Sequence, residues 1–417
     1  MKFQTIRGVH DGLPAVVARW QQVERVARTI FHSHSFDEVR LPILEQTALF
    51  TRSVGEATDI VAKEMYRFVD RGGDDLCLRP EGTAGAVRAF IQGGLGRAGE
   101  QRWFYVGPMF RRERPQKGRL RQFQQIGVER FGAAGPVADI EMLTMAWSLV
   151  AELGIQQVRL ELNSLGCPSC RPGYRDALVA FLQQCEGDLC ATCRDRMATN
   201  PMRVLDCKVA SCQQALTDAP EMLHHLCGDC DTHFGAIQRG LDIPVTINPR
   251  IVRGLDYYNR TAFEIVTDQL GAQGTVIAGG RYDGLVQELG GAATPAIGFA
   301  LGLERIGLLL SDPPATRAEV AVVALGEGAL IPSLRAAEQL RAAGLRTIHC
   351  GGGGGKRQFK QADRCGARFT IILGEDEVAQ GTWTVRNMGE GSQQQCDPAS
   401  AMAQLVQHFA TTRTSKE

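Results

Sequence analysis

Hydrophobic positions follow two different periods along the first 165 residues, and they predict both helices and strands. Apolar residues recur at steps of three and four at Val16, Trp20, Val23, Ala27 and Ile30. That spacing predicts an amphipathic helix, and a similar pattern predicts a second helix over residues 140–150, which Gly154 ends. Alternating or densely apolar stretches predict strands at residues 102–110, 123–131 and 158–162.

The pattern changes in the middle of the chain. From about residue 166 to residue 234 the strand signal fades and nine of the thirteen cysteines appear, which predicts an inserted, largely helical subdomain. Strand character returns at residues 244–247 and 263–266. Residues 294–310 are apolar, with small residues at Gly298 and Gly302, and this stretch predicts a closely packed helix.

The last hundred residues predict a separate αβ domain. Residues 312–316, Asp-Pro-Pro-Ala-Thr, are typical of a linker. Beyond them the pattern predicts strands at residues 320–325, 347–350, 369–373 and 382–385. It predicts helices at residues 334–343, 358–365 and 399–408. A length of about 100 residues is normal for one domain.

Composition adds little to this division. A chain of 417 residues predicts two or three domains. The formal net charge is zero, so any contact with nucleic acid has to come from local patches. The first residues lack the apolar run of a signal peptide, and no apolar stretch approaches the roughly 20 residues of a membrane span. We therefore expect a soluble, cytoplasmic protein.

Two short stretches combine charges, phenol groups and glycines in a way that is typical of a small-molecule pocket. Residues 253–264 read Arg-Gly-Leu-Asp-Tyr-Tyr-Asn-Arg-Thr-Ala-Phe-Glu, and residues 279–285 read Gly-Gly-Arg-Tyr-Asp-Gly-Leu. They are too polar for a core strand and too apolar for a free loop. Aromatic walls, a few polar groups and glycines that admit close backbone approach are the usual parts of a ligand site.

The strand at residues 123–131 presents a polar face. Alternation puts Gln125, Gly127 and Glu129 on one side, where an amide and a carboxylate could receive a ligand amine. The alternative is an exposed strand face with a bulge at Gly127.

The loop before that strand carries six cations and one acidic residue, Glu113. The cations are Arg111, Arg112, Arg114, Lys117, Arg119 and Arg121. Such crowding favours a polyphosphate or a nucleic acid. A solvated hairpin loop is the alternative.

These residues resemble the signatures of histidyl-tRNA synthetases, a family of class II aminoacyl-tRNA synthetases. The loop and its flanks resemble motif 2, which implies that Arg111 holds the α-phosphate of ATP, that Phe123 stacks on adenine, and that Gln116 meets the tRNA acceptor end. Residues 298–305 resemble motif 3, which implies that Arg305 binds the far phosphates, although a cationic helix surface is the alternative. The ATP-binding residues implied are Arg111, Glu113, Arg121, Phe123 and Arg305.

The same resemblance implies the histidine pocket and the catalytic charge. The residues implied to bind histidine are Glu81, Gly82, Thr83, Gln125, Glu129, Tyr257, Tyr258 and Tyr282. In the family, Gln125 and Glu129 match residues that hold the carboxylate and the amine. Arg253 matches the arginine that stabilises the α-phosphate during adenylate formation, so Arg253 and Arg111 are the catalytic residues implied.

The resemblance implies a fold, partners and a function. The fold is α+β: a class II synthetase catalytic domain with an antiparallel sheet flanked by helices, followed by an α/β anticodon-binding domain. The domains implied are residues 1–165 and 236–312 for the two parts of the catalytic domain, 166–235 for the cysteine-rich insertion, and 319–417 for the anticodon-binding domain. Residues 39–44, with Pro42, predict an edge strand and resemble motif 1, which implies a homodimer. The enzyme implied joins histidine to tRNA with ATP and Mg²⁺ through histidyl-adenylate.

The cysteines of the insertion form pairs with metal-ligand spacing. Eight of them are candidate zinc ligands: Cys167, Cys170, Cys190, Cys193, Cys207, Cys212, Cys227 and Cys230. They suffice for one or two tetrahedral Cys₄ sites that hold structural Zn²⁺. Reduced cysteines in an apolar core are the alternative.

Three further alternatives concern the C-terminal domain and the function. Residues 351–356 resemble a phosphate loop but lack its first glycine and its final Ser/Thr, so a turn into a basic helix is favoured, with a merely solvated basic face as the alternative. A regulatory paralogue that senses histidine in histidine biosynthesis would lack the anticodon domain and the motif 2 arginines, and this chain has both. A synthetase-like RNA-binding sensor would have a degenerate pocket.

Overall fold

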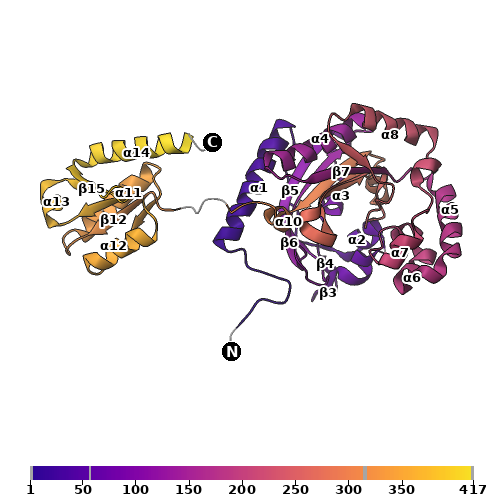
Figure 1. Cartoon of the computed structure of the whole chain (residues 1–417), viewed down its shortest axis with the longest axis horizontal. Helices are drawn as coiled ribbons and strands as arrows, with labels where there is room; N and C mark the ends of the chain where they lie inside the picture. The colour runs from indigo at the N-terminus through magenta and orange to yellow at the C-terminus, as the bar shows by residue number, and fades with distance from the viewer. Residues whose placement is uncertain (1–2, 56–57, 313–316, 415–417) are drawn as a thin grey trace. The chain divides into compact units, whose positions relative to one another are not determined.

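The chain folds into two compact units, Met1–Pro313 and Pro314–Glu417 (Figure 1). The computed structural model describes residues 3–55, 58–312 and 317–414. The predicted linker falls mostly on residues 313–316, which lie outside the described residues. No described helix is both long enough and apolar enough to cross a membrane.

An eight-stranded sheet forms the centre of the first unit. In spatial order its strands are β1 (Asp37–Glu38), β5 (Gln101–Phe110), β6 (Gln122–Phe131), β11 (Ala296–Gly302), β10 (Thr275–Arg281), β9 (Asn259–Thr267), β7 (Val158–Ser164) and β8 (Val245–Ile247). Neighbours from β5 through β7 are antiparallel, while β1 and β8 join the two edges in parallel. The expected antiparallel sheet is therefore present, with a parallel strand at each edge.

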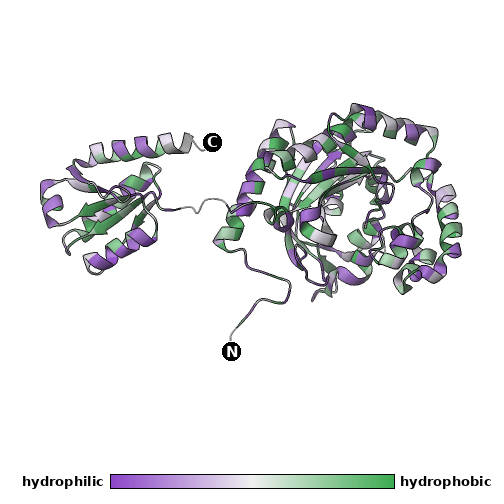
Figure 2. Cartoon of the chain, viewed as in Figure 1, coloured by the Kyte–Doolittle hydropathy of each residue, from purple (hydrophilic) through white to green (hydrophobic). Residues whose placement is uncertain are grey.

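Two hydrophobic cores lie on the two faces of this sheet. On one face the core residues include Phe31, Phe104 and Phe299, and the helices there are α1 (Pro14–Ser33), α4 (Pro136–Glu152) and α10 (Leu303–Gly307). The core of the other face includes Phe90, Tyr257 and Tyr282. The elements there are α2 (Thr47–Val54), α3 (Thr83–Gln92), α9 (Leu285–Glu288) and a small sheet of β2 (Leu44–Gln46), β4 (Asp75–Leu78) and β3 (Tyr66–Val69). Figure 2 shows hydrophobic and hydrophilic residues mixed along the strands of this unit.

The predicted helix at residues 294–310 is wrong over most of its length. Ala296–Gly302 form strand β11 in the middle of the sheet, and only Leu303–Gly307 are helical. A strand buried on both faces shows no alternation, so its apolar run is not distinguishable from a buried helix by period. Gly298 has a different function from helix packing, because a Cβ there would lie 1.9 Å from Glu129 Oε2.

The edge strand predicted at residues 39–44 is shifted in the structure. Strand β1 ends at Glu38 and β2 begins at Leu44, so Pro42 lies between two short strands. The Val39 N–H still donates to the Phe104 carbonyl at 2.8 Å, which extends the edge by one bond.

The insertion between β7 and β8 is helical, as its sequence predicts. Its helices are α5 (Arg171–Gln184), α6 (Ala191–Thr199), α7 (Ala210–Ala215) and α8 (Gly228–Gly240). Short turns at Glu186–Asp188, Pro201–Val204 and Met222–His225 connect them. A separate apolar core, which contains buried cysteines as well as Tyr174, Leu178 and Leu182, holds these elements together.

The second unit has a five-stranded sheet. Its strands in spatial order are β13 (Thr347–His349), β12 (Val320–Ala324), β14 (Phe369–Leu373), β15 (Trp383–Asn387) and β16 (Gln393–Cys396). Its helices are α11 (Leu330–Ala342), α12 (Gly355–Arg364), α13 (Glu375–Gln380) and α14 (Pro398–Thr414). The sequence pattern did not predict α13 or β16, because one is a single short charged helix and the other is a polar edge strand.

Candidate active site

A cleft of about 830 Å³ opens over the sheet, beside the hairpin loop and the insertion. Ten of the residues predicted for histidine and ATP line it: Glu81, Thr83, Arg111, Glu113, Phe123, Gln125, Arg253, Tyr257, Tyr258 and Arg305. Residues from distant parts of the sequence therefore meet at one place. A second hollow, of about 740 Å³, lies against α5 of the insertion and is lined by none of these residues.

Glu129 lies at the centre of a buried hydroxyl cluster below the cleft. Its carboxylate accepts hydrogen bonds from Thr83 Oγ1 at 2.8 Å, Tyr105 Oη at 3.0 Å and Tyr282 Oη at 2.5 Å. Burial raises the pKa of Glu129 to about 8, although the bond from Tyr282 opposes the shift. Because the charged form is disfavoured without a counterion, a ligand ammonium beside Glu129 would be stabilised.

Two glycines make room for this cluster. Gly127 lies opposite Tyr105 in the regular register of β5 and β6, and a Cβ there would be 2.1 Å from the Tyr105 ring. Gly298 lies opposite Glu129 on the other side of β6. Gly127 is buried and the register is unbroken, so the alternative of an exposed face with a bulge is wrong.

Glu81 caps the start of α3 from inside the cleft. The backbone N–H groups of Thr83 and Ala84 donate to its two carboxylate oxygens at 2.7 and 2.8 Å. Burial raises the pKa of Glu81, and these two bonds oppose the shift. Tyr257 Oη is 3.5 Å from Glu81 Oε2, so the carboxylate is held between the helix and the histidine signature.

Two polar atoms of cleft residues have no partner among the residues that the structure describes. These are Gln125 Oε1, an acceptor, and Arg253 Nε, a donor, and both are buried. A buried polar group without a partner costs about 1–3 kcal/mol, which a bound ligand can recover. Arg253 is otherwise held by Glu264, which accepts from Nη1 at 2.5 Å, and by the Tyr258 ring, whose centroid is 5.2 Å from Cζ.

The hairpin loop and α10 bring arginines to the other end of the cleft. Arg111 Cζ is 5.5 Å from the centroid of the Phe123 ring, and its Nε donates to the Pro80 carbonyl at 2.9 Å. Arg305 Nε donates to the Gly118 carbonyl at 3.1 Å, which ties the loop to α10. Burial, with help from nearby Arg119, lowers the pKa of Arg305, so this group would gain from an anionic ligand.

The remaining predicted residues lie outside the lining. Gly82 packs against Tyr105, since a Cβ there would lie 2.2 Å from the ring. Arg121 Nε donates to the Glu113 carbonyl at 3.3 Å, a hydrogen bond within the hairpin loop. Gln116 is exposed at the tip of the loop, where its backbone pairs with Arg119 at 3.1 and 2.9 Å. The structure also shows Arg305 inside the cleft rather than on an open helix surface.

Sequence reasoning missed three groups that shape the cleft. Tyr105 and Glu264 are polar side chains directly flanked by apolar residues, and that contrast was the available signal. Glu304 accepts the Gln124 N–H at 2.9 and 3.1 Å, and burial raises its pKa to about 7. The insertion also contributes Arg196, Arg203, Cys207 and Lys208 to the lining. No local pattern indicates this last contact, because it depends on how distant segments fold together.

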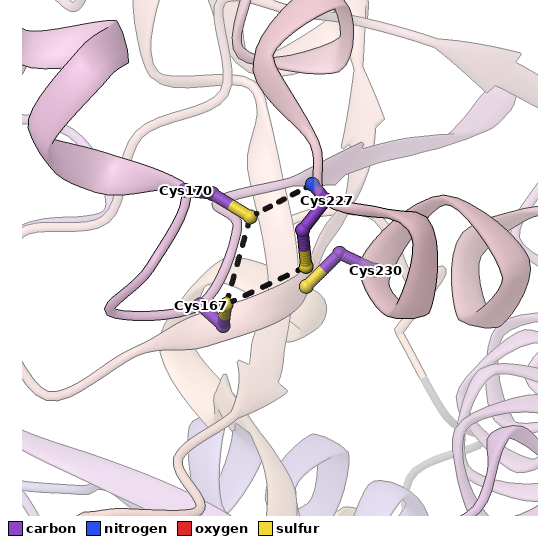
Figure 3. A group of neighbouring side chains, drawn as sticks. All are labelled: Cys167, Cys170, Cys227 and Cys230. Carbon is purple, nitrogen blue, oxygen red and sulfur yellow. Dashed lines mark hydrogen bonds between the residues drawn. The ribbon is translucent and has the colours of Figure 1, made fainter.

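The eight paired cysteines of the insertion form two clusters. The outer cluster is Cys167, Cys170, Cys227 and Cys230, and the inner cluster is Cys190, Cys193, Cys207 and Cys212. Figure 3 shows the outer cluster, whose side chains come from the two ends of the insertion and converge. All thirteen cysteines of the chain are free thiols. Each cluster therefore combines two pairs that are distant in sequence, and in sequence the inner cluster lies between the two pairs of the outer cluster.

The spacing of the sulfur atoms fits a tetrahedral metal. Within each cluster all sulfurs lie within 4.8 Å of one another. The Cys167–Cys170, Cys167–Cys227 and Cys190–Cys207 sulfur separations are 3.5, 3.8 and 4.0 Å. Four thiolates at the usual zinc–sulfur distance of about 2.3 Å would be separated by about 3.8 Å. A core of unrelated cysteines has no reason to match that geometry twice.

In each cluster the surroundings of one thiol favour its deprotonated form, while burial raises the pKa of Cys170, Cys193, Cys207 and Cys230. The backbone N–H of Cys193 is the first of several hydrogen bonds that lower the pKa of Cys190 to about 7. Burial opposes the shift at Cys167, but bonds from Cys170 outweigh it and lower that pKa to about 6. Backbone N–H groups of Cys190 and Cys227 donate to the sulfurs of Cys212 and Cys170, both at 3.1 Å. Such donors are suited to thiolate ligands.

Comparisons with known proteins agree with one another over most of the chain. The family model described as Histidyl-tRNA synthetase matches residues 8–306, and the one described as Anticodon binding domain matches residues 319–408. A Histidine--tRNA ligase of Trichlorobacter lovleyi is 49% identical over 400 residues, which are 94% of this chain and 96% of that protein.

Solved structures resemble the described fold. The apo histidyl-tRNA synthetase of S. aureus has a TM-score of 0.81 and 32% identity, and the match covers 97% of this chain and 100% of that one. A Bacillus halodurans structure described as an ATP phosphoribosyltransferase regulatory subunit/histidyl-tRNA synthetase has a TM-score of 0.66 over 90% and 99% of the two chains. At 18% identity, that second likeness concerns the fold alone.

Proposed function

The chain belongs to the histidyl-tRNA synthetase family, and from that premise we propose which of its residues carry out the ligation of histidine to tRNA. Ligation by this family uses ATP to form histidyl-adenylate and then transfers histidine to the tRNA. One observation carries our assignment: three kinds of group meet at one cleft. They are Glu129 with its hydroxyl donors just below the cleft, the unpartnered atoms Gln125 Oε1 and Arg253 Nε, and the arginines of the hairpin.

Histidine binds, in this proposal, at the end of the cleft nearest Glu129. The Glu129 carboxylate receives the substrate ammonium, since that cation restores the charged form that burial disfavours. Gln125 holds the substrate carboxylate beside it. Glu81 and the two tyrosines of the signature, Tyr257 and Tyr258, face the imidazole, whose two nitrogens need both donors and acceptors.

ATP occupies the end that the hairpin and α10 form. Phe123 supplies a ring for adenine, Arg111 the charge for the α-phosphate, and Arg305 the charge for the far phosphates. Arg253 stabilises the negative charge that develops at the α-phosphate when the histidine carboxylate attacks it. The cleft carboxylates Glu113 and Glu304 would hold a Mg²⁺ ion beside the phosphates, and that ion would neutralise part of their charge.

The tRNA contacts are proposed on charge and exposure. Gln116 and the exposed cations around it at the hairpin tip meet the acceptor end. On the second unit, four exposed cations of α12 meet the anticodon region: Lys356, Arg357, Lys360 and Arg364. We assign residues 1–165 and 236–312 to the catalytic domain, 166–235 to the insertion and 319–417 to anticodon binding. Homodimerisation through the region of Pro42 and a cytoplasmic location, which thirteen free thiols favour, complete the proposal.

The outer and inner clusters each hold one structural Zn²⁺. Four converging sulfurs per cluster and separations near those of a tetrahedral site support this assignment. Each site would use all four of its ligands, so neither leaves a position for substrate. The metals supply cross-links in a region with a small apolar core.

The rival functions fit less well. A regulatory paralogue that senses histidine needs neither Arg111 nor an anticodon-binding domain, and this chain has both. An RNA-binding sensor does not need Glu129 and its three hydroxyl donors.

Histidine-dependent ATP–pyrophosphate exchange separates these alternatives. The purified protein should exchange pyrophosphate with histidine and not with the other amino acids, because a site that hydrogen-bonds its substrate discriminates by about 10⁴-fold or more. It should then charge tRNA with histidine. Absence of histidine-dependent exchange in protein that binds histidine would favour the regulatory paralogue.

A further inference from the structure

The loop that carries Arg253 has little regular structure of its own. Residues 248–258, between β8 and β9, form neither helix nor strand. Two backbone bonds join the loop to the catalytic part of the fold: the Asn248 N–H donates to the Leu162 carbonyl at 3.0 Å, and the Asp256 N–H to the Val54 carbonyl at 3.2 Å. The Asn163 side chain on β7 also donates to the Pro249 and Ile251 carbonyls at 3.1 and 3.0 Å. The sheet side therefore holds the loop as far as Ile251 and again at Asp256, and the stretch between them needs other contacts.

The insertion supplies those contacts on the near side of Arg253. Val252, the residue before Arg253, is 8% exposed and belongs to the apolar core of the insertion together with four cluster cysteines, Cys170, Cys193, Cys212 and Cys230. Arg250 Nη2 donates to the carbonyls of Leu216 and Thr217 at 3.1 and 3.3 Å. The residues just before Arg253 therefore pack against the insertion.

The insertion also holds the far side of the loop. Asn200 Nδ2 donates to Asp256 Oδ1 at 3.0 Å, and Arg171 donates to the Tyr258 carbonyl. Arg196 lies on α6, the helix that ends just before Asn200. Its Nη2 donates to Asp59 Oδ2 at 2.6 Å and joins α6 to another edge of the cleft. Contacts on both sides of Arg253 thus come from one subdomain.

The inner cluster fixes the parts of the insertion that make most of these contacts. Asn200 and Arg196 lie in the segment that the cluster closes between Cys193 and Cys207, and Leu216 follows Cys212 by one turn of chain. Cys207 itself lines the cleft. A metal at this cluster would therefore set the geometry of the segment that borders Arg253.

We propose that the metal of the inner cluster positions the Arg253 loop, so that adenylate formation depends on a zinc ion that touches no substrate. This inference rests on the proposed function of Arg253 and on zinc binding. Val252, Arg250 and Asn200 are positioning residues in it, since they act through Arg253. The insertion is then a metal-dependent support of the active site and not only a separately folded appendage.

The test compares two cysteine variants of the full-length enzyme. Cys207→Ser removes an inner ligand, whereas Cys185→Ser changes a cysteine of the same insertion that belongs to neither cluster and whose thiol bonds to the Phe181 and Leu182 carbonyls. We expect wild type and Cys185→Ser to hold two zinc ions per chain and to exchange pyrophosphate equally. Cys207→Ser should hold one, and its kcat for exchange should fall by about tenfold to a hundredfold, as expected for a misplaced catalytic group.

The two substrates give a readout that general damage would not reproduce. The KM for ATP should change less than about twofold, because Arg111, Phe123 and Arg305 stand on the hairpin and α10 and not on the insertion. Val252→Ala should keep both metals and show the same pattern more weakly. In the double variant, the loss in kcat should be smaller than the two single losses combined, because both changes weaken the same contact between the insertion and the Arg253 loop.

Three outcomes would overturn the inference. They are a Cys207→Ser enzyme with one zinc and the kcat of wild type, an equal loss in Cys185→Ser, and a parallel rise in the KM for ATP. If Cys207→Ser does not fold, stepwise removal of zinc from wild type by a chelator replaces it, and activity that persists after both ions have left overturns the inference. A wild-type enzyme without histidine-dependent exchange would instead contradict the proposed function.

Discussion

The two sides of the cleft hold their functional groups by different means. On the sheet side, strand register and buried contacts fix Glu129, Gln125 and Phe123, and glycines on β6 and β11 leave the space that the Glu129 cluster needs. On the insertion side, Arg253 stands on a loop without regular structure. Glu264 on β9 holds its guanidinium, and contacts with the cysteine-rich subdomain hold the loop on either side of it. The hydrogen bonds of the eight-stranded sheet hold the groups on the sheet side in place. The position of Arg253 depends in addition on the folding of the insertion around its own core.

This difference separates binding from chemistry. The groups that we assign to substrate binding lie mainly on strands and on the start of a helix, where their positions survive changes elsewhere. Arg253, which we assign to the developing charge of the reaction, lies on the side that the insertion with its two cysteine clusters supports. Changes at Glu129 and Gln125 should therefore alter histidine affinity, and changes on the insertion side should alter the rate of adenylate formation.

The largest effect should come from the hairpin, which both substrates and tRNA use. Arg111→Ala should abolish adenylate formation, with a loss of about a thousandfold or more in pyrophosphate exchange, because it removes a charge from the α-phosphate in a low-dielectric site. Gln116→Ala should leave exchange unchanged and slow the transfer of histidine to tRNA. If Gln116→Ala weakened exchange as much as Arg111→Ala, our separation of the two roles would be wrong.

Arg253→Ala tests the insertion side directly. Exchange should fall by about a hundredfold or more, the usual value of one preorganised charge, while the Kd for histidine measured by calorimetry should change little. Arg253→Lys keeps a positive charge without the planar fork and should recover part of the rate. Near-normal exchange in the alanine variant would contradict the assignment of Arg253.

Glu129 predicts a pH dependence on the sheet side. Its pKa is raised to about 8 in the free enzyme, so the carboxylate is mostly neutral below that pH and must ionise to hold the ammonium. Histidine affinity should therefore improve as the pH rises towards 8, by up to about tenfold per unit. Glu129→Gln should bind weakly and lose this slope, which separates Glu129 from titration of the substrate. An unchanged slope in Glu129→Gln would exclude Glu129 as the titrating group.

The same shift affects the stability of the free enzyme. The pKa of Glu129 is raised above its unfolded value of about 4.5, so its contribution to the free energy of unfolding is fully present below pH 4.5 and is lost as the pH rises through about 8. Saturating histidine should oppose that loss, because the ammonium stabilises the ionised form.

The smallest effect should come from a single contact of the loop. Asn200→Ala removes one hydrogen bond to Asp256, which is worth about 1 kcal/mol, and it leaves Val252 and Arg250 in place. We expect the kcat for exchange to fall by about threefold to fivefold with both zinc ions retained. The matched control is Thr199→Ala, one residue earlier in the chain. It removes only an exposed hydrogen bond from Thr199 to the Asp195 carbonyl of its own helix, so it should have no effect.

Local patterns in the sequence predicted much of the sheet side. The hairpin follows from two apolar stretches around a basic loop, and its polar face follows from alternation at Gln125 and Glu129. The same reasoning failed for β11, because a strand buried on both faces has no alternation to detect. The family resemblance, rather than any local pattern, indicated roles for Glu81 and Arg253.

The insertion side was much less predictable. Metal-ligand spacing predicted zinc but left the pairing open, since the two clusters are nested and their partners are up to about sixty residues apart. The seating of Val252 in the insertion and the presence of Arg203 and Cys207 in the cleft depend on contacts between distant segments. A hydrophobic valine before an arginine gives no sign of which core it enters.

The most direct test of the difference between the two sides is one titration on wild-type enzyme. Zinc content, histidine-dependent pyrophosphate exchange and the melting temperature would be measured on the same sample as a chelator removes the metal and added Zn²⁺ restores it. We predict that exchange falls in step with zinc loss and returns on restoration, that the KM for ATP stays constant, and that the melting temperature falls by several degrees. Full exchange activity in protein with less than about 0.2 zinc per chain would contradict the account.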